Sequence, residues 1–318
     1  MNAPRNFALA FGSPRKLPRA RELVGRVVVL DIAFAYDVEG GALKPSSASK
    51  FEQITGKLID GLGGRLAAWV DHHDHARHAD YAADPRFVLA TKAQHPACPE
   101  MVTAELVARV GDVDTIVCHT DFDGLCAAAK WMRGGVEPYA GADADARAID
   151  TRIGKPGPIG ERFDRALRGR PNDEGLCGLV VRHLATGLAD AGLWAPIDRA
   201  AADYQAQEDE ARRQAKGFAR LRGAPHGVAY VDVTPRAGEA RRAYDKTLLL
   251  LLGQEREPIA VVVDRDTVSL AAAFDSGIDF LALLGLSGGM PTRVSVPVQR
   301  LADVLRALGV TDPPPRRG

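Results

Sequence analysis

Short apolar runs alternate along this chain with segments in which apolar residues recur at helical spacing. The apolar runs that read as buried strands are residues 26–30, 66–70, 114–118 and, more weakly, 146–149. Segments 49–62, 98–110 and 125–132 have the spacing or composition of helices. Strands that alternate with helices in this way predict βαβ units. The pattern therefore indicates an α/β fold built on a parallel sheet.

Acidic or histidine residues follow each of the four predicted strands directly. These residues are Asp31 after the first strand, Asp71, His72 and His73 after the second, His119, Asp121 and Asp123 after the third, and Asp150 after the fourth. Ligands of open parallel sheets bind at the carboxyl ends of the strands. We therefore expect these side chains, although distant in sequence, to be neighbours at one edge of the sheet.

Carboxylates mixed with imidazoles suit Mn, Zn or Fe, whereas an all-oxygen set would favour Mg or Ca. His119, Asp121 and Asp123 alternate by two, which predicts that they point to one side of an extended strand end. Gly124 would then free the backbone to turn into a helix. Asp31 could bridge two ions, and such a pair clamps both the attacking and the leaving oxygen of a phosphoryl displacement.

Taken singly, each of these residues has a simpler interpretation. A lone aspartate at a strand end usually caps a helix or shapes a turn. We expect His75 and His78 to lie at the surface or beside the ligands. The run from Asp121 to Gly124 imitates the start of an EF-hand loop, but the acidic twelfth position is missing. The clusters together favour a metal site.

Composition and charge narrow the classes of function. The chain has 318 residues, of which 46% are hydrophobic, and 41 basic residues balance 41 acidic ones. This balance argues against a long nucleic acid as the main ligand. Four cysteines without a Cys-x-x-Cys pair indicate a reducing compartment. With no signal-peptide pattern, and with 247–252 as the longest apolar run, we expect a cytoplasmic protein without a membrane partner.

The second half of the chain predicts a separate, smaller α/β domain. Residues 204–222 are polar with a helical pattern and read as a linker helix. Beyond it we expect strands at 226–233, 258–263 and 267–274, a glycine-rich turn at 287–289, and a helix at 298–308. The predicted organisation is a metal-binding domain at 1–203, a linker helix at 204–224, a second domain at 225–312 and a disordered tail at 313–318.

The polar clusters resemble the motifs of the DHH phosphoesterase family. His119–Gly124 (HTDFDG) resembles the family's His-x-Asp-x-Asp-Gly motif, Asp31 its strand-end Asp, and Asp71-His72-His73 its Asp-His-His. Asp150 is similar to the fourth motif, with Asp198 and Asp203 as fallbacks. The family places the His-x-Asp-x-Asp-Gly motif first, whereas here it comes third. The resemblance therefore implies a circularly permuted member, whose site survives if the strands keep their neighbours.

The resemblance implies two Mn²⁺ ions, with Mg²⁺ or Co²⁺ as substitutes. One ion would be held by His119, Asp121 and Asp31, and the other by Asp123, Asp31, His72 and the fourth aspartate. Asp71 would orient an imidazole, and His73 would face the substrate phosphate and protonate the leaving group.

The second domain resembles the DHH-associated substrate domain. Such domains have a substrate-contacting Gly-Gly-Gly-His stretch, which here reads Ser287-Gly288-Gly289-Met290 without the His and with Arg293 close behind. A plain glycine-rich turn is the other interpretation.

By this resemblance, the preferred substrate is a small nucleotide or short oligonucleotide, as for a nanoRNase, a cyclic-dinucleotide phosphodiesterase or a phosphoadenosine-phosphate phosphatase. A pyrophosphatase or single-strand exonuclease of the same family stays open. So do a nucleotide-binding regulatory protein with degenerate catalysis and a hydrolase with one zinc ion. A homodimer is compatible with the sequence.

Overall fold

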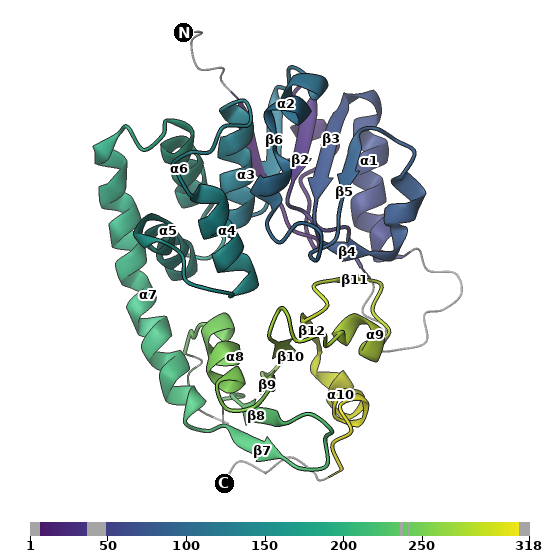
Figure 1. The fold of residues 1–318 in the computed structure, drawn as a ribbon, viewed down its shortest axis with the longest axis vertical. Helices are drawn as coiled ribbons and strands as arrows, with labels where there is room; N and C mark the ends of the chain where they lie inside the picture. The colour runs from purple at the N-terminus through teal and green to yellow at the C-terminus, as the bar shows by residue number, and fades with distance from the viewer. Residues whose placement is uncertain (1–6, 37–48, 236–237, 239, 241, 312–318) are drawn as a thin grey trace. The chain divides into compact units, whose positions relative to one another are not determined.

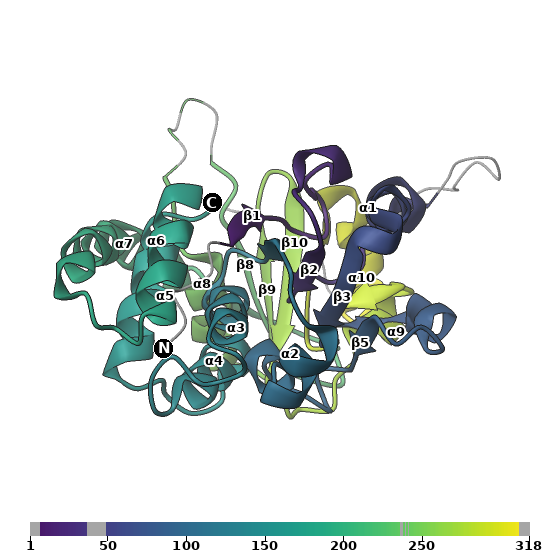
Figure 2. The same cartoon turned by 90° about the horizontal axis from the view of Figure 1, so that it is seen from above.

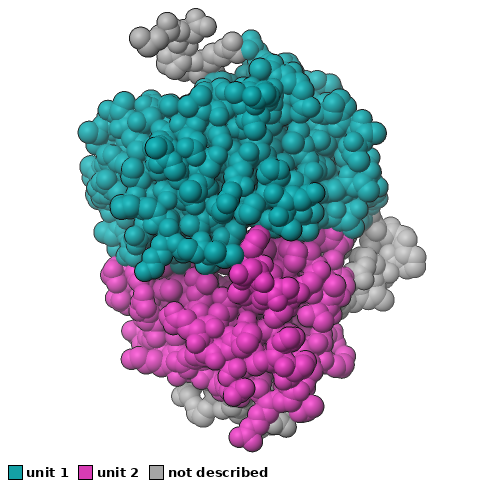
Figure 3. Space-filling model, viewed as in Figure 1, with its two compact units in different colours: residues 1–36, 48–203 teal, residues 37–47, 204–318 magenta. Residues whose placement is uncertain are grey.

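The computed structural model describes residues 7–36, 49–235, 238, 240 and 242–311. The chain divides into two compact units, and the division falls between Asp203 and Tyr204. The described part of unit 1 comprises residues 7–36 and 49–203, and that of unit 2 comprises the described residues from 204 onwards (Figure 3). Each unit has a β-sheet and its own hydrophobic core.

Unit 1 contains a five-stranded sheet in which every neighbouring pair is parallel, with the order β1-β6-β2-β3-β5 (Figure 1). The strands are β1 Ala8–Phe11, β2 Val27–Leu30, β3 Leu66–Asp71, β5 Phe87–Leu89 and β6 Thr115–Cys118. The expected α/β class with a parallel sheet is therefore confirmed. The hydrophobic pattern left β1 and β5 unpredicted, because each is short and lies at an edge of the sheet.

Helices lie on both faces of this sheet (Figure 2). On one side is α1 Lys57–Leu62, which continues a π-helical turn Phe51–Gly56, and on the other are α2 Ala104–Val110 and α3 Phe122–Met132. Helices α4 Ala142–Thr151, α5 Pro158–Gly169 and α6 Glu174–Ala185 pack against α3. Val28 and Leu30 join the core with α2 and α3, whereas Val27 and Val29 join the core with α1. Because alternate residues of a strand face opposite sides, the unbroken Val-Val-Val-Leu run is that of a strand buried on both faces.

The strand register aligns the carboxyl ends of three central strands. Leu30 at the end of β2 pairs with Val70 of β3 and with Cys118 of β6. The next residues in the three strands are Asp31, Asp71 and His119. The sheet therefore brings these three polar groups to one edge, as the sequence predicted.

The strand predicted at 146–149 was wrong, because these residues lie inside helix α4. Ala142, Ala146 and Ile149 are buried, and their spacing of four and three residues is that of a helix face. The four-residue window was too short to show this period. The helix predicted at 98–110 is likewise two elements, a 3₁₀ turn Cys98–Met101 and α2, because the Thr103 side chain accepts a hydrogen bond from the Leu106 N–H and caps α2.

Unit 2 contains a mixed sheet of order β12-β10-β9-β8-β7, in which β8 and β9 are parallel and the other pairs antiparallel. Its strands are β7 Ala219–Leu221, β8 Val228–Asp232, β9 Ile259–Val263, β10 Thr267–Ala272 and β12 Arg293–Pro297. Its helices are α8 Lys246–Gln254, α9 Phe280–Leu284 and α10 Leu301–Ala307. The predicted helix at 298–308 is a 3₁₀ turn Val298–Arg300 followed by α10.

The boundary between the two units falls within helix α7, Trp194–Ala215. The helix predicted at 204–222 therefore begins earlier and ends earlier than expected, and 219–221 form strand β7. The tail predicted at 313–318 lies outside the described residues. Among the helices of the described chain, none combines the length and the apolar character needed to cross a bilayer.

Candidate metal centre

Asp31 follows strand β2 and adopts an unusual backbone conformation. Its φ angle is +57°, in the left-handed region that residues with a side chain rarely occupy. Its side chain is buried, and among the described residues none donates a hydrogen bond to its Oδ2 atom. A strained backbone with a buried, unsatisfied carboxylate oxygen is costly in folding free energy and is typical of functional sites. Asp31 is therefore a strong candidate ligand.

Asp31, His119 and Asp121 form what we call the first ligand group. Each offers one ligand atom, and these atoms lie within 4.8 Å of one another. His119 Nδ1 is 2.9 Å from Asp121 Oδ2 and 3.9 Å from Asp31 Oδ2. Asp121 is the N-cap of α3 and accepts the Gly124 N–H through its other oxygen at 3.1 Å. The hydrogen bond of the cap fixes the carboxylate beside the imidazole.

His72, Asp123 and Asp150 form the second ligand group, again with ligand atoms within 4.8 Å of one another. His72 Nε2 is 3.1 Å from Asp123 Oδ2 and 3.1 Å from Asp31 Oδ1, so Asp31 adjoins both groups. Asp123 lies in the first turn of α3, and Asp150 lies near the end of α4. The expectation that His119, Asp121 and Asp123 line one side of an extended strand was wrong, since β6 ends at Cys118 and α3 has begun by Asp123.

Backbone groups hold His72 and Asp123 in place. The His72 Nδ1–H donates to the His95 carbonyl at 2.7 Å, which leaves the Nε2 lone pair facing the carboxylates when the ring is neutral. The Cys98 N–H donates to Asp123 Oδ1 at 3.0 Å. Such outer contacts orient ligands in metal sites. The contributions of His95 and Cys98 could not be predicted from residue type, because both come from the main chain.

The carboxylates repel one another strongly when no cation is bound. Burial, together with the charges of Asp123 and Asp121, raises the pKa of Asp31 well above its ordinary value. Burial alone would lower the pKa of His119, but Asp121 and Asp31 outweigh it and raise that pKa to about 9. The raised pKa values of Asp31 and His119 show that additional positive charge at these two residues is favourable. Oxygen and imidazole ligands in this arrangement fit divalent cations such as Mn²⁺.

Lys92 is a residue of this site that sequence reasoning missed. It is buried, and its ammonium group contacts His72 Nε2 at 2.8 Å and also Asp150 Oδ2. Burial alone would lower the pKa of Lys92, but the carboxylates of Asp150, Asp123 and Asp31 raise it, so the group stays charged. Lys92 lies three residues beyond strand β5, which was not predicted. Recognition of β5 would have placed the residues after Leu89 at the same edge of the sheet.

Asp71 and His73 form a pair beside the ligand groups. The His73 Nδ1–H donates to Asp71 Oδ1 at 2.7 Å, while Asp71 is fully buried and His73 partly exposed. The same nitrogen lies 4.0 Å from Asp31 Oδ1. Because Nδ1 is held by Asp71, Nε2 is the nitrogen of His73 that remains free for proton transfer.

The remaining candidate residues lie elsewhere. Asp198 and Asp203, the fallbacks for the fourth motif, pair with Arg162 and Arg170 at the surface and belong to neither ligand group. His75 lies in β4, Asp74–His75, and its Nδ1 accepts the Arg77 N–H, whereas both it and His78 contact the Phe34 ring edge to face. These two histidines therefore pack against the aromatic side chain of Phe34 and belong to neither ligand group.

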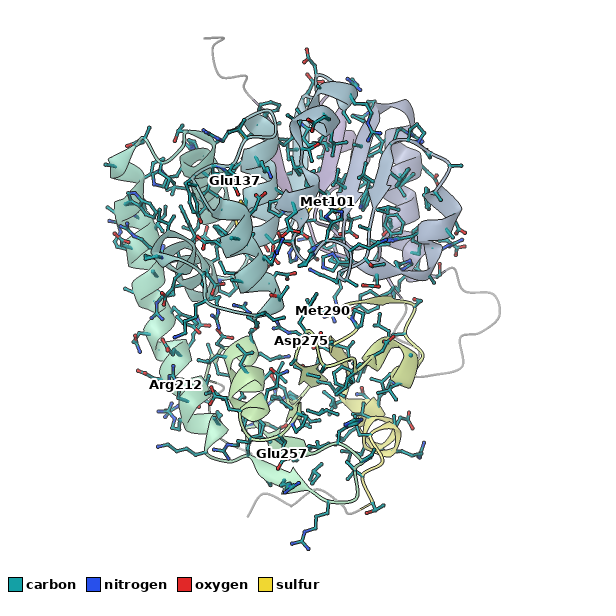
Figure 4. The ribbon with its side chains drawn as sticks, in the orientation of Figure 1. Met101, Glu137, Arg212, Glu257, Asp275 and Met290 are labelled. Atoms are coloured by element: carbon teal, nitrogen blue, oxygen red, sulfur yellow. The ribbon has the colours of Figure 1, made fainter. Side chains whose placement is uncertain are left out.

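The glycine-rich turn is part of unit 2. Gly288 and Gly289 form the short strand β11, with both residues buried and with φ +127° at Gly289. Met290 follows directly in the chain (Figure 4). Arg293 begins β12, and its guanidinium donates to Thr247 Oγ1. The proposed role of these residues in substrate binding stays a prediction.

Gly124 is required for a reason other than the one the sequence suggested. It lies inside α3 in a helical conformation, so it needs no special backbone freedom. A Cβ atom at this position would lie 2.8–2.9 Å from the backbone and Cβ atoms of His119. Only glycine therefore allows α3 to begin so close to the ligand at the end of β6.

We expect Gly124→Ala to push His119 away from Asp31 and Asp121. The overpacking should cost about 1–3 kcal/mol of unfolding free energy and should weaken Mn²⁺ binding. Chemical denaturation and calorimetric titration with Mn²⁺ measure the two effects. Gly178→Ala is a matched control, because this helical glycine of α6 has open space around it. Equal Mn²⁺ affinity in the two variants would contradict the role assigned to Gly124.

Comparison with known proteins gave few matches. No protein-family model matches the sequence, and no curated protein does either. Among solved structures, the chain is similar to the pGpG-specific phosphodiesterase PggH of Vibrio cholerae, at 11% identity and TM-score 0.42, over 76% of this chain and 78% of that one. It is also similar to exonuclease RecJ bound to manganese, at 14% identity and TM-score 0.46, over 91% and 77%. Both TM-scores are below 0.5, so the function proposed for this chain rests on its own residues.

Proposed function

We propose that this chain is a two-metal-ion phosphodiesterase of the DHH type, which hydrolyses small nucleotides or short oligonucleotides. The observation that carries the proposal is the pair of adjoining ligand groups at one edge of the parallel sheet, in which Asp31 of the first group lies 3.1 Å from His72 of the second. Bound divalent ions, for which Mn²⁺ is the first choice and Mg²⁺ or Co²⁺ substitutes, would activate water and neutralise phosphate charge. The chain's own residues would hold these ions, orient the phosphate and move protons.

The motif order is part of this proposal. The DHH resemblance implies a circular permutation, which keeps the site only if the motif-bearing strands remain neighbours. Strand β6, which ends at His119, lies beside β2, which ends at Asp31, and β2 lies beside β3 with Asp71. This adjacency supports a permuted DHH arrangement. Asp150 fits the fourth motif better than its fallbacks because it belongs to the second ligand group.

His73 is the proposed donor of a proton to the leaving oxygen. The Asp71 carboxylate accepts the Nδ1–H, fixes the orientation of the ring and stabilises its protonated form. Burial and the charge of Lys92 lower the pKa of His73 in the free chain, so the ring is largely neutral at pH 7. A bound phosphate would bring negative charge close to Nε2 and raise this pKa, so protonation would be coupled to substrate binding.

We expect His73→Gln to lower the kcat for a dinucleotide by about a hundredfold or more, the usual contribution of a general acid. Hydrolysis of bis-p-nitrophenyl phosphate should fall much less, because p-nitrophenolate leaves without protonation. Mn²⁺ affinity, measured by calorimetry, should stay unchanged. An equal loss on both substrates together with weakened Mn²⁺ binding would instead make His73 a metal ligand.

Neutral net charge and the resemblance of unit 2 to a substrate domain support a small nucleotide substrate over a long polymer or pyrophosphate. In unit 2, Gly288, Gly289 and Arg293 are the proposed contacts to that substrate. A cytoplasmic location and a homodimer are part of this proposal, since both are compatible with the sequence. The buried thiols of Cys98, Cys118, Cys126 and Cys177 agree with a reducing compartment.

The decisive test is a screen of phosphate esters at neutral pH with Mn²⁺, in which the substrates are dinucleotides, cyclic dinucleotides, 3′-phosphoadenosine phosphate, pyrophosphate and single-stranded DNA. We expect metal-dependent release of mononucleotides from one of the first three. Asp123→Ala and His72→Ala should abolish it. Nucleotide binding without turnover would favour a regulatory protein, and unchanged rates in both variants would overturn the proposal.

A further inference from the structure

Unlike a solvated surface lysine, Lys92 is buried and paired with other side chains of the site. Its side chain is only 3% exposed, and its ammonium group contacts His72 Nε2 and Asp150 Oδ2. A buried charge is strongly unfavourable unless it is paired and hydrogen-bonded. Here the partners are the buried imidazole of His72 and the partly exposed carboxylate of Asp150. The ammonium group is therefore built into the cluster as a positive charge.

The ammonium group uses the atoms that a metal ion would need. His72 Nδ1 donates to the His95 carbonyl, so Nε2 is the nitrogen of that ring that a metal ion would bind. The Lys92 ammonium nitrogen lies 2.8 Å from this Nε2 atom. A carboxylate oxygen of Asp150 binds the same ammonium group. Lys92 and a divalent ion therefore cannot bind His72 at the same time.

The first ligand group has no such internal cation. Among the described residues, no lysine or arginine forms a salt bridge with Asp31 or Asp121. The basic groups that pair with these carboxylates in the described part of the chain are imidazoles, which an arriving ion can deprotonate and bind. The two ligand groups thus offer similar ligand atoms, but the second also contains a lysine ammonium group that would compete with a metal ion.

We propose that Lys92 is a tethered cation that occupies the second ligand group and competes with a divalent ion for it. The first group then fills at low metal concentration, and the second fills only when the ammonium group withdraws. This inference rests on the proposed two-ion function and assigns the order in which the ions bind. Lys92 is a positioning residue, since it acts on the metal through the ligands.

The flexible four-carbon stem of lysine makes such an exchange feasible, because the ammonium group can move while the backbone stays in place. In the metal-free chain the same group offsets the repulsion between Asp123 and Asp150. The consequence is that metal binding extends over a wide concentration range, with full occupancy reached only at concentrations well above those that fill the first group.

The test is a titration of the full-length, chelator-treated protein with Mn²⁺, followed by calorimetry and by equilibrium dialysis with elemental analysis. The wild type should bind two ions with well-separated affinities. Lys92→Met, which keeps the apolar stem and removes the charge, should tighten the second ion by about tenfold or more, or about 1.4 kcal/mol. Lys92→Arg keeps a cation and should leave the second ion weak.

Lys130→Met is the matched control. Lys130 is also a buried lysine of unit 1, bonded to Asp143 and to the Pro99 carbonyl, but it lies outside both ligand groups. Its variant should keep the wild-type separation between the two affinities. Circular dichroism identifies any variant that does not fold, and Lys92→Gln replaces Lys92→Met in that case.

Equal affinity for the second ion in wild type and Lys92→Met would overturn the Lys92 proposal and leave the two-ion function standing. The same holds if Lys130→Met tightens the second ion as much as Lys92→Met does. Failure of the wild type and of every variant to bind Mn²⁺ at millimolar concentration would overturn the two-ion function itself, and the inference with it.

Discussion

Replacement of Asp31 by Asn is expected to lower Mn²⁺-dependent phosphodiester hydrolysis by about a thousandfold or more, or about 4 kcal/mol of transition-state stabilisation. Asp31 is the carboxylate that adjoins both ligand groups, with its Oδ1 near His72 and its Oδ2 near His119. The amide is nearly isosteric but lacks the charge and one of the oxygen ligands. Calorimetric titration should show that Mn²⁺ binding is lost together with the rate.

The control for this substitution is Asp203→Asn. Asp203 was an alternative candidate for the fourth ligand, but it pairs with Arg170 at the surface. Both variants remove one aspartate charge from unit 1, and only Asp31→Asn should lose activity. A fully active Asp31→Asn variant, or a loss of similar size in Asp203→Asn, would contradict the site. The metal-free Asp31→Asn chain should also be more stable than the wild type, because repulsion with Asp121 and Asp123 is relieved.

Metal removal is expected to make stability depend on pH in a specific direction. Because Asp121 and Asp31 raise the pKa of His119 from 6.5 to about 9, the folded chain holds this proton more tightly than the unfolded chain. The resulting stabilisation is fully present below pH 6.5 and is lost as pH rises through about 9. The raised pKa of Asp31 acts in the same direction at lower pH. We expect the free energy of unfolding to fall by about 3 kcal/mol across this window.

Urea denaturation in the presence of a chelator, at intervals from pH 6 to 9.5, measures this effect. His119→Gln should flatten the profile, because it removes the titrating group. Saturating Mn²⁺ should reverse the trend, since a metal ion binds the unprotonated imidazole and so binds better at higher pH. A metal-free wild type whose stability is constant or rises between pH 6.5 and 9 would contradict the electrostatic description of the site.

The sequence could predict the residues of the site that directly follow strands. Asp31, Asp71 and His119 each follow an apolar run, and parallel strands place their carboxyl ends at one edge. Asp150 was selected correctly as a neighbour of the cluster but for a wrong reason. It lies on helix α4 rather than at a strand end, and only tertiary packing brings it to Lys92 and His72. The resemblance to a family motif, rather than the local pattern, directed attention to it.

Lys92 could not be predicted from the sequence as a residue of the site. A single lysine in a polar segment is usually solvated, and strand β5 has only three residues and one partner strand, so its apolar signal is weak. The main-chain contacts from His95 and Cys98 have no sequence signature at all, because every residue except proline has the same donor and acceptor. The acidic and histidine residues of the cluster were thus predictable from residue type, but the main-chain groups and the lysine that contact them were not.

A crystal structure of the wild-type protein, grown with excess Mn²⁺ and measured near the manganese absorption edge, would test the two-ion site without any substitution. We expect an anomalous peak coordinated by Asp31, His119 and Asp121. At high Mn²⁺ we expect a second peak coordinated by His72, Asp123 and Asp150, with the Lys92 ammonium group withdrawn. Manganese bound elsewhere on the chain, with no peak in contact with Asp31, would contradict the two-ion site.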